Sequence, residues 1–90
     1  MPITVRLSDL LQTVAGIRGP LSITGHTPAE CLQNLTAQYP RLRSWLYDEK
    51  GHLKPQIWLL VNGERIYATE MQRPLGEGDE LFVIVAVLGG

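Results

Sequence analysis

Apolar and polar residues alternate at several places along the chain, and this alternation predicts β-strands. Near the start, Ile3, Val5 and Leu7 alternate with Thr4 and Arg6, which is the pattern of a strand with one buried face. Strands are also expected at about residues 21–24, 56–61, 64–67 and 80–87. Asn62-Gly63 is the commonest two-residue hairpin signal, and it joins the strand at residues 56–61 to the strand at residues 64–67.

Helical spacing of apolar residues predicts three helices between the strands. Residues 8–19 favour only a turn or two, because Gly19-Pro20 reverses the chain. The main helix begins at Thr27-Pro28-Ala29-Glu30, where Thr27 can cap free amides, Pro28 suits the first helical position and Glu30 completes a capping box. Its apolar stripe runs to Pro40, and residues 41–47 predict a second short helix.

The last strand is apolar at every position from 81 to 87, which predicts a central place in the sheet. One main helix buries only one face of a sheet, so the other face is left with apolar side chains that are partly exposed. We predict that this face meets a protein partner through Trp58, Leu60, Phe82 and Ile84. The alternative is that the short helices and residues 71–75 fold over it.

Composition and charge narrow the class of protein. Ninety residues, 44% of them hydrophobic and 19% charged, fit one globular domain that is too small to enclose a substrate cavity as well. A net charge of -1 with interspersed signs argues against nucleic acid as a partner. The longest apolar runs fall far short of the roughly 20 residues of a membrane-spanning helix, so no membrane role is expected. No secretory signal is visible, which makes the cytoplasm the expected location.

Candidate catalytic and metal-binding residues are few. Cys31 lies on the apolar stripe of the main helix and is expected to be a core residue, while His26 and His52 have no partner spacing for a metal or a triad. Gly76-Glu77-Gly78 leads into a strand and not into a helix N-terminus, so it predicts a turn and not a phosphate loop. We therefore expect neither an enzyme nor a bound metal or cofactor.

Two glycines, Gly89-Gly90, close the sequence directly after the last strand. The layout resembles the ubiquitin-like β-grasp family, and within it the MoaD and ThiS sulfur carriers, over essentially the full length. The resemblance is carried by residues 35–40 (LTAQYP), 60–64 (LVNGE) and 75–81 (LGEGDEL), and by the Gly-Gly end. Residues 46–55 look like the insertion of the longer MoaD/CysO-like type.

This resemblance implies an α+β fold, in which a mixed sheet of about five strands packs on one main helix plus short helices. Residues 1–87 would form the β-grasp domain and residues 88–90 a flexible Gly-Gly tail. The resemblance also implies that Leu88, Gly89 and Gly90 enter a partner's active site, where the carboxylate of Gly90 is the reacting group. A carboxylate is an anion at neutral pH and a poor electrophile, so it must be activated.

In such carriers, an E1-like adenylyltransferase of the MoeB/ThiF type uses ATP to form an acyl-adenylate at the terminal glycine. A sulfur donor then converts the adenylate to a thiocarboxylate, and an acceptor synthase uses the sulfur to make cysteine, molybdopterin or a thio-containing metabolite. Glycine suits both closing positions, because it has no Cβ to obstruct a narrow channel. By this resemblance, the chain is a substrate of enzymes and is not one itself.

Two other functions are compatible with the same residues. A ubiquitin-like modifier would be joined to lysines of other proteins through Gly90, since an acyl-adenylate can react with an amine as well as with a sulfur donor. A plain adaptor would use only the edge or face of its sheet, and deletion of Gly89 and Gly90 would then have no effect.

Overall fold

The computed structural model describes residues 2–86 of the chain. Ten elements follow one another in the order β1 (Pro2–Leu7), α1 (Asp9–Ala15), β2 (Leu21–Thr24), α2 (Pro28–Gln38), η1 (Pro40–Leu42), α3 (Arg43–Leu46), β3 (Ile57–Val61), β4 (Glu64–Ile66), η2 (Ala68–Glu70) and β5 (Glu80–Val85). Each strand and helix predicted from the sequence is present. The strand bounds agree within one residue, apart from the end of β5, and the short helix predicted within residues 8–19 ends at Ala15.

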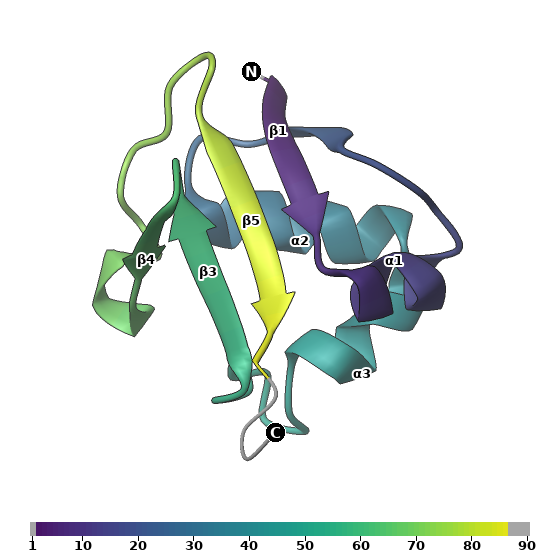
Figure 1. Cartoon of the computed structure of the whole chain (residues 1–90). Helices are drawn as coiled ribbons and strands as arrows, with labels where there is room; N and C mark the ends of the chain where they lie inside the picture. Colours follow the sequence, from purple (N-terminus) through teal and green to yellow (C-terminus); the bar gives the residue numbers. More distant parts are fainter. Residues whose placement is uncertain (1, 87–90) are drawn as a thin grey trace.

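The five strands form a single mixed sheet in the order β2-β1-β5-β3-β4. β5 is the middle strand, as its continuous apolar sequence predicts. It pairs in parallel with β1 and antiparallel with β3, so the beginning and the end of the described chain lie side by side (Figure 1). The helices lie behind the sheet in that view, with α2 crossing it.

The hydrophobic core lies between the sheet and the helices. Alternate strand residues point into it, as the burial of Ile3, Val5 and Leu7 in β1 and of Leu81 and Val83 in β5 shows. The helices contribute fully buried side chains to the same cluster: Leu11, Cys31, Leu32, Leu35, Leu42 and Leu46. None of the helices within residues 2–86 is long and apolar enough to cross a membrane.

The start of α2 shows how its sequence caps it. The Thr27 hydroxyl accepts a hydrogen bond from the Glu30 amide at 3.1 Å, as predicted, and Pro28 occupies the first turn. The Glu30 carboxylate does not return to Thr27 as a capping box requires; it accepts from the amide of His26, at 3.0 Å. The prediction of a capping box is therefore wrong in its second hydrogen bond, which Glu30 accepts from the residue before Thr27.

Turns fix how the strands pair. Asn62 and Gly63 have φ angles of +51° and +84°, which is the conformation of a type I′ turn and explains why asparagine and glycine stand there. Because this loop contains two residues, Val61 pairs with Glu64 and Leu60 with Arg65. This register decides which side chains of β4 lie on each face of the sheet.

Candidate functional site

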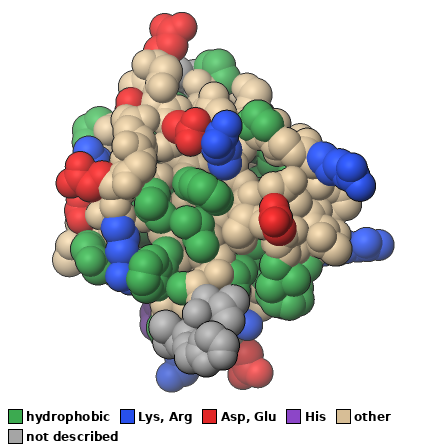
Figure 2. Space-filling model, viewed as in Figure 1, with side chains coloured by type: hydrophobic (Ala, Val, Ile, Leu, Met, Phe, Trp, Pro, Cys, Tyr) green, Lys and Arg blue, Asp and Glu red, His purple; other side chains and the backbone are tan. Residues whose placement is uncertain are grey.

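The sheet face opposite the helices carries an apolar centre of four side chains. Trp58 lies directly across from Ile84, and Leu60 lies across from Phe82, on the adjacent strands β3 and β5. All four are half-buried, whereas the alternate residues of the same strands are buried in the core. Hydrophobic side chains gather over β3 and β5 on this face (Figure 2). We call this surface the open face.

The short helices and residues 71–75 do not cover the open face. The carbonyl of Met71 accepts a hydrogen bond from the Ala29 amide at 3.0 Å, and the Leu75 amide donates to the carbonyl of His26 at 2.8 Å. Leu75 is only 7% exposed and belongs to the core cluster. The segment therefore packs beside the start of α2, on the helix side of the sheet, and the covering alternative is wrong.

An aromatic-bound arginine borders the open face on the β4 side. The guanidinium of Arg65 lies 3.8 Å from the ring centroid of Trp58 and 4.6 Å from that of Tyr67. Sequence analysis missed both Arg65 and Tyr67 as site residues. The available signal was the Asn62-Gly63 hairpin, which places Arg65 opposite Leu60 and so on the same face.

The opposite border of the open face holds an ion pair. Arg6 of β1 lies beside Phe82 in the parallel ladder, and its Nε is 3.6 Å from a carboxylate oxygen of Glu80. Both side chains are substantially exposed. Such a surface pair adds little to stability, so its main effect is that Glu80 neutralises the charge of Arg6 at this border.

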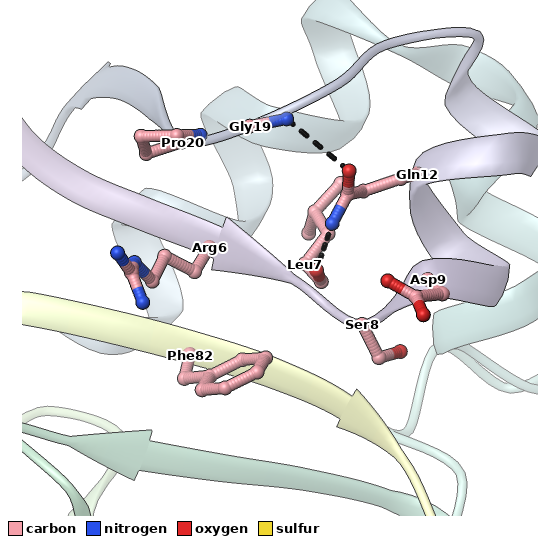
Figure 3. A pocket seen from close by; sticks show the side chains of 8 residues that line it. All are labelled: Arg6, Leu7, Ser8, Asp9, Gln12, Gly19, Pro20 and Phe82. Atoms are coloured by element: carbon pink, nitrogen blue, oxygen red, sulfur yellow. Dashed lines mark hydrogen bonds between the residues drawn. The ribbon is translucent and has the colours of Figure 1, made fainter.

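Next to this ion pair the surface is hollowed. An open hollow of about 420 Å³ is lined by side chains from β1, α1, the loop before β2 and β5. Gln12 shapes it, because its amide donates to the carbonyl of Leu7 and accepts from the amide of Gly19 (Figure 3). Phe82 and Arg6 both project on this side (Figure 3), so the hollow continues the open face toward α1.

The end of β5 is held from both sides. The Val85 amide donates to the Ser8 hydroxyl at 3.3 Å, and the Ala86 amide donates to the carbonyl of Gln56 at 2.7 Å. β5 ends at Val85, so the predicted strand to residue 87 is shorter by at least Ala86. The predicted tail residues Leu88, Gly89 and Gly90, and Val87 with them, lie outside the described residues.

The remaining candidates, Cys31, His26 and His52, form no common site. Cys31 is buried in α2, and burial, followed by the charge of Glu30, raises its pKa to about 11. His26 and His52 are exposed and lie near Glu30 and Asp48, at 3.5 and 4.0 Å. Within residues 2–86, no three His, Cys, Asp or Glu side chains are grouped as a metal site would require.

The Gly76-Glu77-Gly78 segment is a turn, as its position before a strand predicted. The Asp79 carboxylate accepts a hydrogen bond from the Gly76 amide at 2.7 Å and another from the Asn62 side chain at 3.0 Å. These two hydrogen bonds stabilise the ionised form and hold the pKa of Asp79 below its ordinary value. The Asp79 carboxylate therefore stabilises the turn through these two hydrogen bonds.

A mixed five-stranded sheet on one main helix, with an open apolar face, defines the ubiquitin-like β-grasp class, and solved structures bear this out. SAMP1 from Haloferax volcanii is 29% identical, with a TM-score of 0.83 over all of both chains. CysO, in the Amycolatopsis orientalis BexX/CysO complex, is 25% identical, with a TM-score of 0.82 over 98% of this chain and 99% of that one. Urm1 from Trypanosoma brucei is 25% identical, with a TM-score of 0.71 over 99% and 95%.

No protein-family model and no curated protein matches the chain. The structural similarity nevertheless covers whole chains on both sides, and the matched structures are ubiquitin-like β-grasp sulfur-carrier and modifier proteins. The chain has the ubiquitin-like β-grasp fold, and its similarity to these structures is consistent with the MoaD/CysO-like type, as the resemblance of its sequence predicted.

Proposed function

We propose that this protein is a sulfur carrier whose reacting group is the carboxylate of Gly90. The observation that carries the proposal is the whole-length structural match to small sulfur-carrier and modifier proteins, combined with a Gly-Gly sequence shortly after the central strand. Gly90 as the free chain end is part of the proposal. The protein binds no cofactor of its own in this scheme, because ATP is used by the partner enzyme.

The proposed chemistry has two steps. A carboxylate oxygen of Gly90 attacks the α-phosphorus of ATP on an E1-like adenylyltransferase of the MoeB/ThiF type, and pyrophosphate leaves. A sulfur donor at the hydrosulfide level then attacks the carbonyl carbon and displaces AMP, so a C–S bond replaces a C–O bond without net oxidation. The thiocarboxylate passes its sulfur to an acceptor synthase in cysteine, molybdopterin or thio-metabolite synthesis.

Hydrogen bonds at the end of β5 support this role, because they hold the last described residues in place. Val85 and Ala86 are fixed by hydrogen bonds to Ser8 and Gln56, so the position at which residue 87 begins is set by the folded body. Fully extended, residues 87–90 would span about 13 Å, enough to enter an active site of another protein. Glycine at positions 89 and 90 adds no side chain along that path.

Intact mass spectrometry tests the proposal. The purified protein is incubated with ATP, an E1-like enzyme from the same genome and sulfide, and a parallel sample omits ATP. The expected result is a mass change that corresponds to exchange of one oxygen for sulfur at Gly90, and only with ATP. An unchanged mass with an enzyme that is active on its own cognate carrier would overturn the proposal.

Conjugation to proteins is a second candidate, because a matched structure is named a small archaeal modifier protein. An amine would then attack the adenylate-derived acyl group and form an amide bond through Gly90. Blots of lysates for an N-terminally tagged chain separate the two functions. Adducts that survive reduction and boiling support conjugation, and a single free band argues against it.

A further inference from the structure

Ser8 lies at the junction between β1 and α1, beside the end of β5. Its amide donates to the Val83 carbonyl at 3.0 Å, which continues the parallel ladder between β1 and β5. In a parallel ladder, the carbonyl of the same residue accepts from the amide two positions further along the partner strand, which here is Val85. The Ser8 carbonyl instead accepts from the Gln12 amide at 3.0 Å, as the first hydrogen bond of α1. The start of α1 therefore takes the backbone acceptor that Val85 would use.

The Ser8 hydroxyl replaces that acceptor. It accepts from the Val85 amide at 3.3 Å, and the Ser8 side chain extends toward β5 in Figure 3. A serine at a helix N-cap ordinarily uses its hydroxyl for a free amide of the first helical turn. Ser8 is the N-cap residue of α1, yet within the described part of the chain its side chain caps no amide of that helix. The hydroxyl thus holds the end of the last strand and not the start of the helix.

The β3 side holds the chain one residue later and then ends. The Ala86 amide donates to the Gln56 carbonyl at 2.7 Å. The next hydrogen-bonded pair in this antiparallel register would require the backbone of Lys54. The Lys54 amide already donates to the Leu46 carbonyl at 2.8 Å, and its carbonyl accepts from the Ile57 amide at 3.0 Å. Ala86 is therefore the last residue for which the β3 side provides a partner.

We propose that Ser8 is a positioning residue for the reaction at Gly90. Its hydroxyl fixes Val85, and together with the Gln56 carbonyl on the other side it sets the point and the direction from which residue 87 begins. Four residues, 87–90, separate this point from the reacting carboxylate, so a shift at Val85 is passed on through a short segment. The expected effect is on the rate of reaction and not on affinity, because orientation of the reacting group is what changes. The inference rests on the proposed function for the identity of that group.

Single-turnover adenylation tests this role, with ATP and an excess of an E1-like enzyme from the same genome at several concentrations. Ser8→Ala should lower the maximal rate by roughly three- to tenfold, while the enzyme concentration at half-maximal rate changes by less than about twofold. Ser8→Thr, which keeps a hydroxyl, should restore most of the rate. Thr13→Ala is the matched control: it removes a hydroxyl that donates to the Asp9 carbonyl at 3.1 Å within α1, and it should leave both values unchanged.

Amide hydrogen exchange without any enzyme checks the hydrogen bond itself. Ser8→Ala should speed exchange at Val85 by roughly fivefold or more, with Leu81 in the centre of the sheet unchanged. Unchanged exchange at Val85 would overturn the inference. Ser8→Gly also lacks the hydroxyl and suits an N-cap position, so it replaces Ser8→Ala if thermal melting shows that alanine disrupts the fold.

The outcomes separate this inference from the proposed function. If Ser8→Ala reacts as fast as the unchanged protein, or Ser8→Thr reacts as slowly as Ser8→Ala, the inference is overturned even where Gly90 carries sulfur. A loss that disappears at saturating enzyme also overturns it, because affinity alone has then changed. If adenylation depends on the Ser8 hydroxyl but sulfide gives no mass change, the inference stands and sulfur carriage falls. If the unchanged protein is not adenylated, both fall.

Discussion

Gly25, which directly follows β2, lies against Cys31 in the first turn of α2. A Cβ placed on Gly25 would lie 2.5 Å from the Cys31 sulfur and 3.0 Å from the Cys31 backbone nitrogen. Glycine is needed there for space, and the thiol fills the core on the other side of the contact. The raised pKa of Cys31, about 11, keeps this thiol protonated at neutral pH, so its role is packing.

Gly25→Ala is expected to lower the free energy of unfolding by about 1–3 kcal/mol, because the added methyl group overpacks this contact. The loss should be smaller in a Cys31→Ala background, where the sulfur is gone but the backbone nitrogen stays 3.0 Å from the new carbon. Urea unfolding of the four proteins of this cycle measures both values. An equal loss in both backgrounds would show that the sulfur contact contributes nothing.

The turn before β4, at Asn62, is hydrogen-bonded to the turn before β5, at Asp79. The Asn62 amide group donates to the Asp79 carboxylate at 3.0 Å, and its oxygen accepts from the Glu80 amide at 2.9 Å. Asp79 also accepts from the Gly76 amide. The β3–β4 hairpin is thereby fixed against the turn that starts the central strand.

Asp79→Asn should destabilise the protein at pH 7 and have little effect near pH 2. The folded pKa of Asp79 is lowered by its two hydrogen bonds, so the stability that its ionisation provides is present above the unfolded pKa of about 3.9. That stability is lost as the pH falls through the lower folded value. Urea unfolding at both pH values gives the difference, with the exposed Glu77→Gln in the same turn as control. A loss of equal size at both pH values would contradict the assignment.

Elements with strong local signals were predicted well from the sequence. Alternation located β1 and β3, Thr27-Pro28 located the start of α2, and Asn62-Gly63 set the hairpin. The open face followed from counting helices against sheet faces. The strand order was not predicted beyond the central place of the last strand, because the pairing of β1 with β5 joins residues far apart in the sequence.

Contacts between side chains were beyond sequence reasoning. The Arg65 guanidinium could stack on Trp58 only because β3 and β4 pair in one particular register, and the rotamers that bring them together are set by the folded surface. Likewise, Glu30 bonds to His26 and not to Thr27, because the backbone before α2 presents that amide to the carboxylate. The Asn62–Asp79 bond spans two turns that no local pattern connects.

At the scale of the whole molecule, the sheet divides the protein into two functional sides. One side holds the core and the helices, and the other holds the open face with Arg65. In the proposed function, the open face binds a partner while the residues beyond β5 react. Substitutions on the face and at the chain end should therefore change different measurements, affinity in the first case and the rate of charging in the second.

Gly90→Ala is expected to slow adenylation by roughly tenfold to a hundredfold, because the added methyl group lies next to the carboxylate whose oxygen attacks ATP. Leu88→Ala, two residues away, should slow it less. ATP–pyrophosphate exchange with saturating enzyme measures both rates, and deletion of residues 89–90 provides the inactive control. Equal rates for Gly90→Ala and Leu88→Ala would contradict Gly90 as the site of reaction.

The parallel pairing of β1 with β5 also determines when the sheet can form during synthesis of the chain. The strand that completes the centre of the sheet is synthesised last, so a nascent chain cannot close its core until residues 80–85 have left the ribosome. A product that stops before β5 leaves β1 and β3 without their shared neighbour and exposes apolar strand edges to degradation or aggregation. A chain interrupted before β5 therefore cannot form the five-stranded sheet or its open face.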